Sequence, residues 1–343
     1  MKRLLRMALL GLAGTFAVEM PASADWKQSP AIKELYEKAK VEGEVVIWGT
    51  NTREVDWIPA AFAAEWPGIK VNALGDNDIA PKIIAETRAG RHAVDVYWSS
   101  ITGVAPIVQR ELPTSVDWSI FGLSKDNTAF DGRMGFTNNI VYVVAYDTRK
   151  MSEADMPKIW DQLLEPKYKD KMAGSLFLMP RLVSALSIKW GQDKALDFAR
   201  KLAGDTGILL TRAPRESILQ SGERVMAAGE VDTLPKLWAA GGMPVKYVIP
   251  APVVLGQFGA TVLARAPHPN AARLLAGWLT SKEGKMAREK GNFEVDYRPG
   301  SDHPDARKIY ASGVAVIEDR VEEMEARAAL YKKAADILTG QSK

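Results

Sequence analysis

Two well-separated apolar runs dominate the hydrophobic pattern of the chain. At 136–148 the sequence reads FTNNIVYVVAYDT, and at 246–269 it reads KYVIPAPVVLGQFGATVLARAPHP. Both runs are rich in the β-branched and aromatic residues that form buried strands. The residues between them have an α/β pattern of their own. We therefore predict that the two runs cross between two lobes, and that a ligand would be held between the lobes.

Before the first run, helical and strand-like spacing alternate along the chain. The predicted elements are helices at 30–41, 57–66 and 79–87 and strands at 45–48, 69–74 and 93–98. The order of strand, helix and strand is typical of a βαβ unit with a parallel sheet.

Between and after the two runs the alternation continues. We predict strands at 174–178 and 208–211, and helices at 193–202 and at 216–228, the latter ended by Gly229 as a C-cap. The tail is more helical. Its last segment, 314–338, has long helical periodicity with mixed charge, which predicts a solvated helix packed on the first lobe.

The whole pattern predicts an α/β protein of two lobes, because its length exceeds what one hydrophobic core usually serves. The first lobe would comprise residues 25–138 plus 255–343, and the second residues 139–254. Each lobe would contain a mostly parallel sheet flanked by helices, and the two crossing strands would form the hinge.

The N-terminus has the features of a secretory signal peptide. Lys2, Arg3 and Arg6 precede an apolar run at 7–18, and Ala-Ser-Ala at 22–24 is a cleavage site of the A-x-A type. We expect cleavage after residue 24 and export. The alternative is a buried first helix of a cytosolic enzyme. No later run is long and apolar enough to predict a membrane span.

Composition narrows the possible functions. The chain has no cysteine, which excludes disulfides, thiolate catalysis, cysteine-ligated metals and an N-terminal lipid anchor. Removal of the signal peptide lowers the formal charge from +3 to +1, and the basic residues are interspersed with acids. We therefore expect a periplasmic protein that binds no nucleic acid.

Catalytic motifs are missing from the sequence. Its three histidines, His92, His268 and His303, have no metal-binding spacing such as H-E-x-x-H. There is no G-x-S-x-G elbow and no Walker loop. Asp302 and Asp305 flank the last histidine in a loop that we interpret as solvated. The sequence predicts no catalytic residue, no metal site and no cofactor.

Polar turns follow several predicted strands, at the sheet edge where open α/β folds bind ligands. In the first lobe the candidate ligand-binding residues are Thr50, Asn51, Ser99 and Ser100. Hydroxyl and amide groups at helix starts, together with unpaired N–H groups, favour anions. Each of these side chains is equally well explained as a helix N-cap.

The corresponding turn of the second lobe contains Arg181 and Ser184. A guanidinium can bind a carboxylate or phosphate through two hydrogen bonds, whereas a cationic solute needs carboxylates, which these loops lack. We therefore expect an anionic organic solute. The alternative for Arg181 is a surface charge or a salt bridge to Glu216 or Asp232.

Further candidates lie on the crossings and in the second lobe. Asn139 begins the first crossing, and Ser217 lies in the helix that follows Arg212 and Arg215. Trp238 and Phe258 have rings that stack on a flat or sugar-like ligand, although large aromatic residues more often belong to a core or cleft wall.

Five segments, taken in this order and spacing, resemble the periplasmic solute-binding proteins of ABC importers, in particular the type 2 branch related to ferric-ion-binding proteins. They are GEVVIWGT at 43–50, AVDVYWSS at 93–100, VYVVAYDTRKM at 141–151, AAGEVD at 227–232 and PNAARLLAGWLTSKEG at 269–284. The resemblance implies a two-lobed type 2 fold. It also implies a monomeric receptor that closes on a small solute and delivers it to permease subunits in the inner membrane. Tyr297 matches a segment that often borders the cleft in this family.

The chain departs from the iron-binding members of that family. Those proteins place adjacent tyrosines shortly after the position matching residues 228–230, where this chain reads VDTLPKLWAAGG. Phenolates suit a hard ferric ion, and none is present there. A ferric receptor that uses scattered tyrosines remains one alternative, and a secreted enzyme on the same scaffold remains another.

Overall fold

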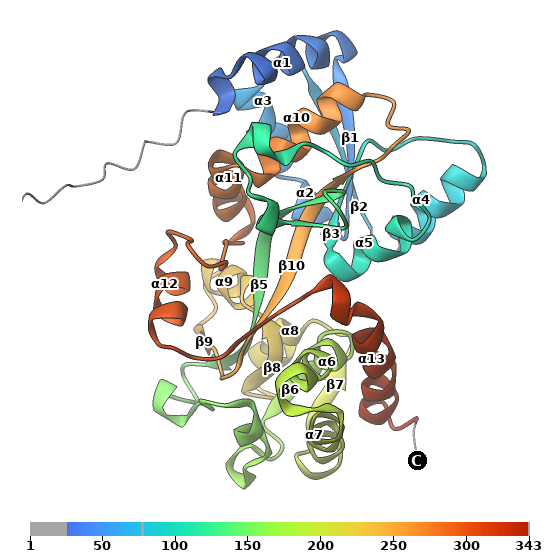
Figure 1. Ribbon diagram of the computed structural model, residues 1–343. Coiled ribbons are helices and arrows are strands. Elements are labelled where there is room, and N and C mark those ends of the chain that lie inside the picture. Colours follow the sequence, from blue (N-terminus) through green and yellow to red (C-terminus); the bar gives the residue numbers. More distant parts are fainter. Residues whose placement is uncertain (1–25, 77–78, 342–343) are drawn as a thin grey trace, which may run out of the picture.

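The computed structural model describes residues 26–76 and 79–341. The predicted signal peptide lies outside these residues. Two lobes lie one above the other and are joined by the long strands β5 (Met134–Asp147) and β10 (Val253–Val262) (Figure 1). The mixed α/β fold with two lobes agrees with the sequence-based prediction.

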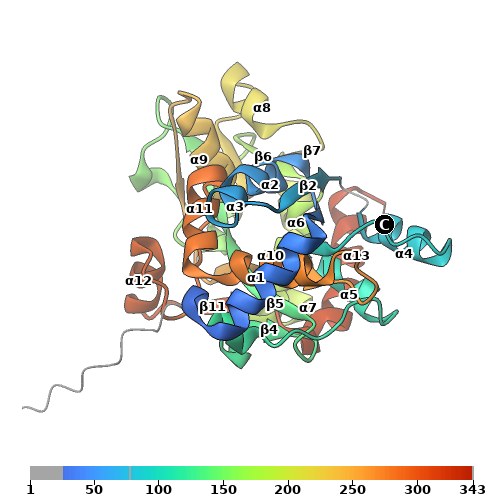
Figure 2. The same cartoon turned by 90° about the horizontal axis from the view of Figure 1, so that it is seen from above.

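The first lobe has a parallel βαβ arrangement at its centre. Strand β1 (Glu44–Gly49) pairs in parallel with β2 (Lys70–Gly75) on one side and with β3 (Val96–Ser100) on the other. Helix α1 (Pro30–Glu42) packs against α10 (Pro269–Thr280) on the outer side of this sheet (Figures 1 and 2). The other elements are α2 (Thr52–Val55), α3 (Ile58–Glu65), α4 (Ile79–Arg88), α5 (Ile101–Val108), β4 (Thr128–Ala129) and α11 (Lys282–Asn292).

The second lobe repeats the scheme around a second hydrophobic core. Strand β6 (Met172–Ser175) pairs in parallel with β7 (Leu209–Thr211) and with β8 (Met226–Val231). Its remaining elements are α6 (Leu178–Trp190), α7 (Gln192–Asp205), α8 (Arg215–Ser221), α9 (Thr233–Ala240) and β9 (Val245–Val248). Short 3-10 helices lie at Trp26–Gln28, Trp118–Phe121, Lys125–Asn127, Glu153–Asp155, Trp160–Leu164, Pro166–Tyr168 and Val321–Glu323.

The sheets of the two lobes are continuous through the crossing strands. The strand order is β2-β1-β3-β10-β5-β8-β6-β7. The first part of β5 pairs antiparallel with β10, and its last part pairs antiparallel with β8 and β9. Almost every residue of β5 is buried, and Ile140 is the half-buried exception. The predicted first crossing is therefore confirmed.

The second crossing differs from the prediction of one long strand. The apolar run at 246–269 is divided into β9 and β10, with Pro250 and Pro252 between them. Proline has no N–H to donate to a strand ladder, so the pairing stops at this point. Of these two strands, β10 is the one that crosses between the lobes.

The predicted helix at 216–228 is present but is too long by its second half. Helix α8 ends at Ser221, where Gly222 adopts a left-handed conformation with φ of 76°. Residues from Met226 onward belong to β8, and Gly229 lies within that strand with φ of 65°. A side chain at Gly229 would meet Met179 Sδ at 2.2 Å, so a glycine is required there for packing and not for helix capping.

The C-terminal segment contains a strand and a helix. Helix α12 (Pro304–Ala311) flanks the crossing strands, and β11 (Val316–Glu318) pairs in parallel with β10. Helix α13 (Met324–Leu338) then packs against α6 and α7 of the second lobe (Figure 1). The sequence predicted packing on the first lobe instead. The apolar residues of α13 do not reveal which of two apolar surfaces they cover.

Candidate functional site between the lobes

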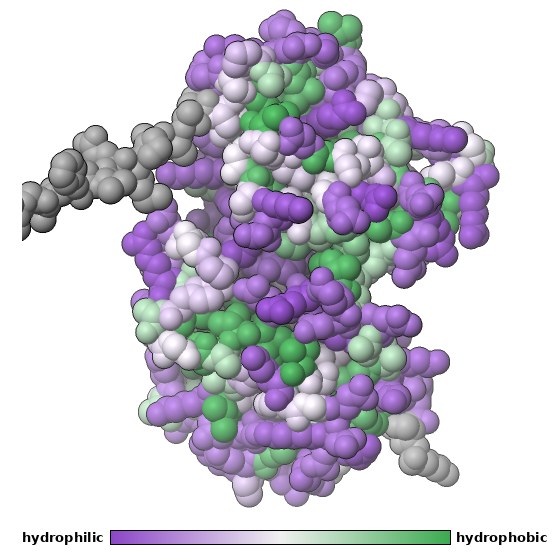
Figure 3. Space-filling model, in the orientation of Figure 1, coloured by the Kyte–Doolittle hydropathy of each residue, from purple (hydrophilic) through white to green (hydrophobic). Residues whose placement is uncertain are grey.

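A cavity of about 310 Å³ lies where the two lobes meet the crossing strands. The surface is hollowed between the two halves of the molecule (Figure 3). The lining residues come from both lobes, from both crossing strands and from the C-terminal segment. They are Ser100, Thr102, Gly103, Ile140, Tyr142, Arg181, Ser184, Gly256, Phe258, Asp319, Arg327, Ala328 and Tyr331. The volume is within the range of small-molecule sites.

The first lobe contributes the end of β3 and the start of α5. Ser100 is the N-cap of α5: its Oγ accepts a hydrogen bond from Gly103 N at 3.2 Å and lies 3.0 Å from Thr102 Oγ1. Phe258, on β10, packs against Trp98 with ring centroids 5.1 Å apart. This side of the cavity therefore has two hydroxyl groups beside an aromatic surface.

The second lobe contributes Arg181 and Ser184 from α6. Ser184 Oγ donates a hydrogen bond to the Arg181 carbonyl at 2.9 Å, so this hydroxyl is used within its own helix. The Arg181 guanidinium makes no hydrogen bond or ion pair with any described residue. The two partners considered for it are bound elsewhere: Asp232 to Lys236 at 2.6 Å, and Glu216 to Gln220 at 3.4 Å.

The C-terminal segment contributes residues that sequence reasoning missed. Asp319 follows β11, Arg327 and Tyr331 lie on α13, and Arg327 Nη1 donates to Asp319 Oδ1. The backbone N–H of Gln257 donates to Asp319 Oδ2 at 3.2 Å. The mixed charge of 314–338 was the only signal, and it is equally typical of a solvated helix.

Tyr142 lines the cavity from the middle of β5. Burial raises the pKa of its phenol to about 12, although the charge of Arg181 acts in the opposite direction. The hydroxyl is therefore neutral at physiological pH and is able to donate or accept a hydrogen bond.

Thr50 and Asn51 lie next to a carboxylate. Thr50 Oγ1 donates to Glu54 Oε2, and Asn51 caps α2 by accepting from Glu54 N at 3.2 Å. Burial raises the pKa of Glu54, while the hydrogen bonds from Thr50 and Asn51 and the charges of Arg53 and Arg181 act to lower it. Thr50, Asn51 and Glu54 are not among the residues that line the cavity, so these two predicted ligand-binding residues lie outside it.

More acidic groups are buried near the crossing strands. Glu230 makes an ion pair with Arg215, with Nε and Oε2 2.7 Å apart. Glu294 accepts hydrogen bonds at 2.8 Å from Asn138 and from Asn292. Burial raises the pKa of Glu294 to about 8.

Comparison with known proteins identifies the family. The family model for bacterial extracellular solute-binding proteins matches residues 57–291. This chain belongs to that family. No curated protein sequence matches the chain.

Solved structures show the same fold at low sequence identity. Iron-bound HitA from Pseudomonas aeruginosa is 20% identical, with a TM-score of 0.70, over 85% of this chain and 99% of that one. An ABC transporter substrate-binding protein from Bradyrhizobium japonicum is 14% identical, with a TM-score of 0.72, over 86% and 99%. The substrate-binding protein of an ABC transporter from Agrobacterium tumefaciens is 14% identical, with a TM-score of 0.71, over 86% and 94%. These likenesses establish the two-lobed fold and leave the ligand open.

Several predicted ligand-binding residues of this solute-binding protein lie outside the cavity. Trp238 is buried in a second-lobe core with Ala227 and Met243. Ser217 lies exposed on α8, and Ser99 is buried beneath α5, where a Cβ on Gly103 would meet its Oγ. These positions follow from side-chain direction, which loop composition does not reveal.

Asn139 and Tyr297 lie at the crossing strands and are fully buried. Asn139 donates to Gln257 Oε1 and accepts from Tyr297 N at 3.1 Å. The Tyr297 hydroxyl donates to Asp232 at 2.7 Å, and burial with the nearby Asp232 charge raises its pKa well above the ordinary value. Both residues therefore join the crossing strands to each other and to the loop after α11.

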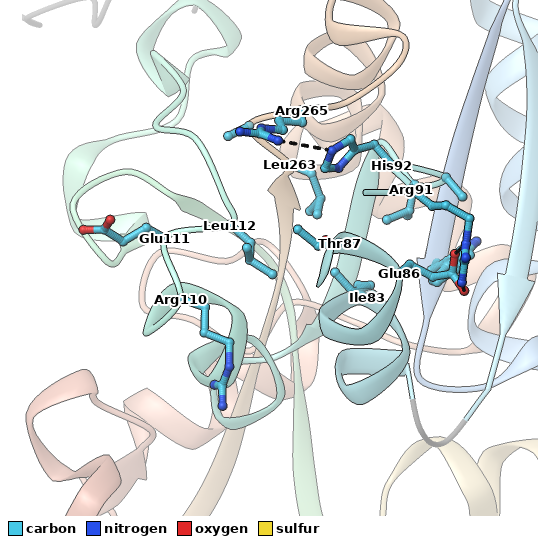
Figure 4. Close-up of a pocket in the computed structure, with 14 residues that line it drawn as sticks. Ile83, Glu86, Thr87, Arg91, His92, Arg110, Glu111, Leu112, Leu263 and Arg265 are labelled. Atoms are coloured by element: carbon cyan, nitrogen blue, oxygen red, sulfur yellow. Dashed lines mark hydrogen bonds and ion pairs between the residues drawn. The ribbon is translucent and has the colours of Figure 1, made fainter. Parts of the chain in front are cut away.

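A second cavity of the solute-binding protein, of about 320 Å³, lies at the outer end of the first lobe (Figure 4). Leu263 and Leu112 point into it, whereas Arg110 and Glu111 point away (Figure 4). It lies at the amino end of β3, opposite the carboxyl edge where α/β sheets bind ligands. We therefore take the cavity between the lobes as the candidate site.

The three histidines of the protein also lie away from the cavity lining. His268 Nδ1 is 2.9 Å from Asp95 Oδ2 beside the start of α10, and His303 Nε2 is 3.5 Å from Glu289. Across residues 26–76 and 79–341, no cluster of histidine and acidic side chains is arranged to hold a metal ion. No described helix has the length and apolarity needed to cross a membrane.

Proposed function

We propose that this protein is a periplasmic receptor of an ABC importer that closes its two lobes on a small anionic organic solute, a carboxylate or a phosphate ester. The observation that carries the proposal is the guanidinium of Arg181 at the cavity between the lobes, which has no hydrogen-bond or ion-pair partner among the described residues. The side chain is exposed and therefore solvated in the ligand-free protein, and a solute carboxylate would replace that water through two charge-assisted hydrogen bonds.

The other side of the cavity supports the same solute class. Ser100 and Thr102 present hydroxyl groups at the start of α5, where the helix dipole favours negative charge. Phe258 offers an apolar surface for the carbon skeleton of the solute. Because both lobes contribute, a solute that touches both would shift the population toward the closed form.

The role in transport rests on similarity and on the N-terminus. The structural neighbours from Agrobacterium and Bradyrhizobium are substrate-binding proteins of ABC transporters. A signal peptide cleaved after residue 24 would export the chain. The receptor would then act as a monomer that passes its solute to the permease subunits.

A thermal-shift screen of organic acids, phosphate esters, sugars and amines tests the proposal, because a ligand present at 100 times its Kd adds about 2.7 kcal/mol of stability. We expect anions to stabilise the protein. R181Q should weaken the best anion by about 10- to 100-fold, the effect of a lost charge-assisted hydrogen bond. Arg200 lies exposed on α7, away from the cavity, so R200Q is the matched control. Stabilisation by an amine alone would contradict the proposal.

A second candidate function is ferric-ion binding. Tyr142 and Tyr331 both line the cavity together with Asp319, a set of oxygen ligands that a hard metal ion prefers. The raised pKa of Tyr142 opposes this function, because the phenol must lose its proton to bind iron. If the protein nevertheless binds ferric ion through Tyr142, loading with ferric ion should produce a visible charge-transfer band, and Y142F should remove that band. A colourless protein after loading would exclude this candidate.

A further inference from the structure

Among the described residues, the lining of the cavity between the lobes includes two arginine side chains and one free positive charge. Arg181 has no ion-pair partner among the described residues, whereas Arg327 is paired with Asp319. Both arginines and the aspartate line the same cavity. The cation available to a solute is therefore that of Arg181.

The pair of Asp319 and Arg327 is held in place and is not a mobile surface contact. Its side chains are only 9% and 11% exposed. Asp319 Oδ2 also accepts a hydrogen bond from the backbone of Gln257 on the crossing strand β10. The Nε of Arg327 is buried and makes no hydrogen bond to any described residue. Arg327 therefore still has an N–H group that could donate a hydrogen bond, but its positive charge is balanced by Asp319.

The free charge of Arg181 determines how much negative charge the cavity balances. A solute with one negative charge would balance Arg181. The second charge of a dianion would lie beside the pair of Asp319 and Arg327, where no free cation among the lining residues offsets the cost of removing that charge from water.

We propose that this cavity selects singly charged anions over doubly charged ones, and that Asp319 determines the selection by neutralising Arg327. The inference rests on the proposed function and narrows its solute class to monocarboxylates and other monoanions. Asp319 and Arg327 both lie beyond residues 57–291, the part that matches the family model. The selection is thus supplied by the C-terminal segment of this chain.

The test compares matched anions on matched variants. The probes are butyrate with succinate, benzoate with phthalate, and nitrate with sulfate, measured by calorimetric titration near neutral pH at constant ionic strength. The proteins are wild type, D319N, the double variant D319N/R327Q, and D302N. Asp302 pairs with Arg307 on the exposed surface, and neither residue lines the cavity, so D302N is the control for the loss of one aspartate charge and one ion pair outside the site.

We expect wild type and D302N to bind the monoanion of a pair more tightly than the dianion. In D319N the freed guanidinium of Arg327 should improve dianion binding by about tenfold or more relative to the monoanion. The double variant should lose that gain, because it lacks the freed cation. This loss separates a charge effect from a change in cavity shape.

Other outcomes overturn one proposal or both. If wild type binds dianions as well as monoanions, and R181Q weakens both, the receptor function stands and the charge selection is wrong. The charge selection is also wrong, and the receptor function still stands, if D319N leaves the preference for monoanions over dianions unchanged. If no anion binds wild type or D319N more tightly than it binds R181Q, both the anion-receptor function and the selection are wrong.

Discussion

Two polar regions lie between the lobes, and they differ in how completely their groups are hydrogen-bonded. The hinge network joins β5, β10, the start of α9 and the loop after α11 through hydrogen bonds of five side chains. These are Asn139, Asp232, Lys236, Gln257 and Tyr297. In the solute cavity, Arg181 has no such partner among the described residues.

This difference distinguishes a structural role from a binding role. Buried polar groups that satisfy one another fix the arrangement of the chain and leave nothing for a ligand. A charged group at a cavity without a partner has the opposite property. The same residue types, asparagine, aspartate and tyrosine, are thus structural in the hinge network, while the free arginine indicates where a solute binds.

The largest expected effect comes from breaking the hinge network at Asp232. Its carboxylate accepts from Val141 N at 3.0 Å, from Lys236 at 2.6 Å and from the Tyr297 hydroxyl at 2.7 Å. D232A should lower the free energy of unfolding by about 3–5 kcal/mol, because it leaves two buried donors without an acceptor and the half-buried Lys236 without its ion-pair partner. Urea denaturation measures this change.

The control for that experiment is D302A, which removes an exposed aspartate and should change stability by less than about 0.5 kcal/mol. If D232A is as stable as D302A, the hinge network is not the structural element that its hydrogen bonds indicate.

The next effect is a pH dependence of the free energy of unfolding, caused by Glu294. Burial raises the pKa of Glu294 from its ordinary value of 4.5 to about 8. Between these values the folded protein retains a proton that the unfolded chain releases, so stability falls as pH rises. The contribution is complete below the unfolded value and is lost by about pH 8.

E294Q should flatten that dependence, since the amide does not titrate. Unfolding free energies of wild type and E294Q between pH 5 and 8 supply the measurement, and exposed Glu325 gives the control E325Q. Parallel curves for wild type and E294Q would show that Glu294 does not titrate in this range.

Substitution of Arg181, unlike that of Asp232, should change solute binding and leave the stability of the ligand-free protein almost unchanged. Because its guanidinium makes no hydrogen bond or ion pair with the described residues, R181Q should change the unfolding free energy of the ligand-free protein by less than about 0.5 kcal/mol. The same variant should lose about 10- to 100-fold in affinity for anions. A destabilised R181Q would place this residue among the structural groups and weaken the comparison.

The sequence predicted the architecture better than the site. A strand such as β5 can be predicted from the sequence because both of its faces are buried, which requires a nearly continuous run of apolar residues. The same reasoning failed at the second crossing, where prolines interrupt an apolar run, and at α8, where β8 follows within a few residues. Local composition did not separate those elements.

For the site, the sequence predicted Ser100, Arg181, Ser184 and Phe258 but not Asp319, Arg327 or Tyr331. The missed residues reach the cavity because α13 packs on the second lobe, a tertiary contact without a local signal. Trp238 was predicted from its aromatic ring and Tyr297 from the family resemblance, yet both side chains point into cores. Residue type indicates what a side chain is able to bind, whereas packing determines what it faces.

Tyr331 gives the smallest effect and the finest test of the comparison. It lies half-buried at the cavity, and no hydrogen bond of its hydroxyl to another described residue is present. If that hydroxyl contacts the solute, Y331F should weaken anion binding by up to about tenfold, the value of one neutral hydrogen bond, with no change in stability. Tyr36, whose hydroxyl donates to the Pro67 carbonyl at 2.6 Å, gives Y36F as a control in which affinity is unchanged. Equal affinities for Y331F and wild type would confine the solute to the side of the cavity formed by Arg181, Ser100 and Phe258.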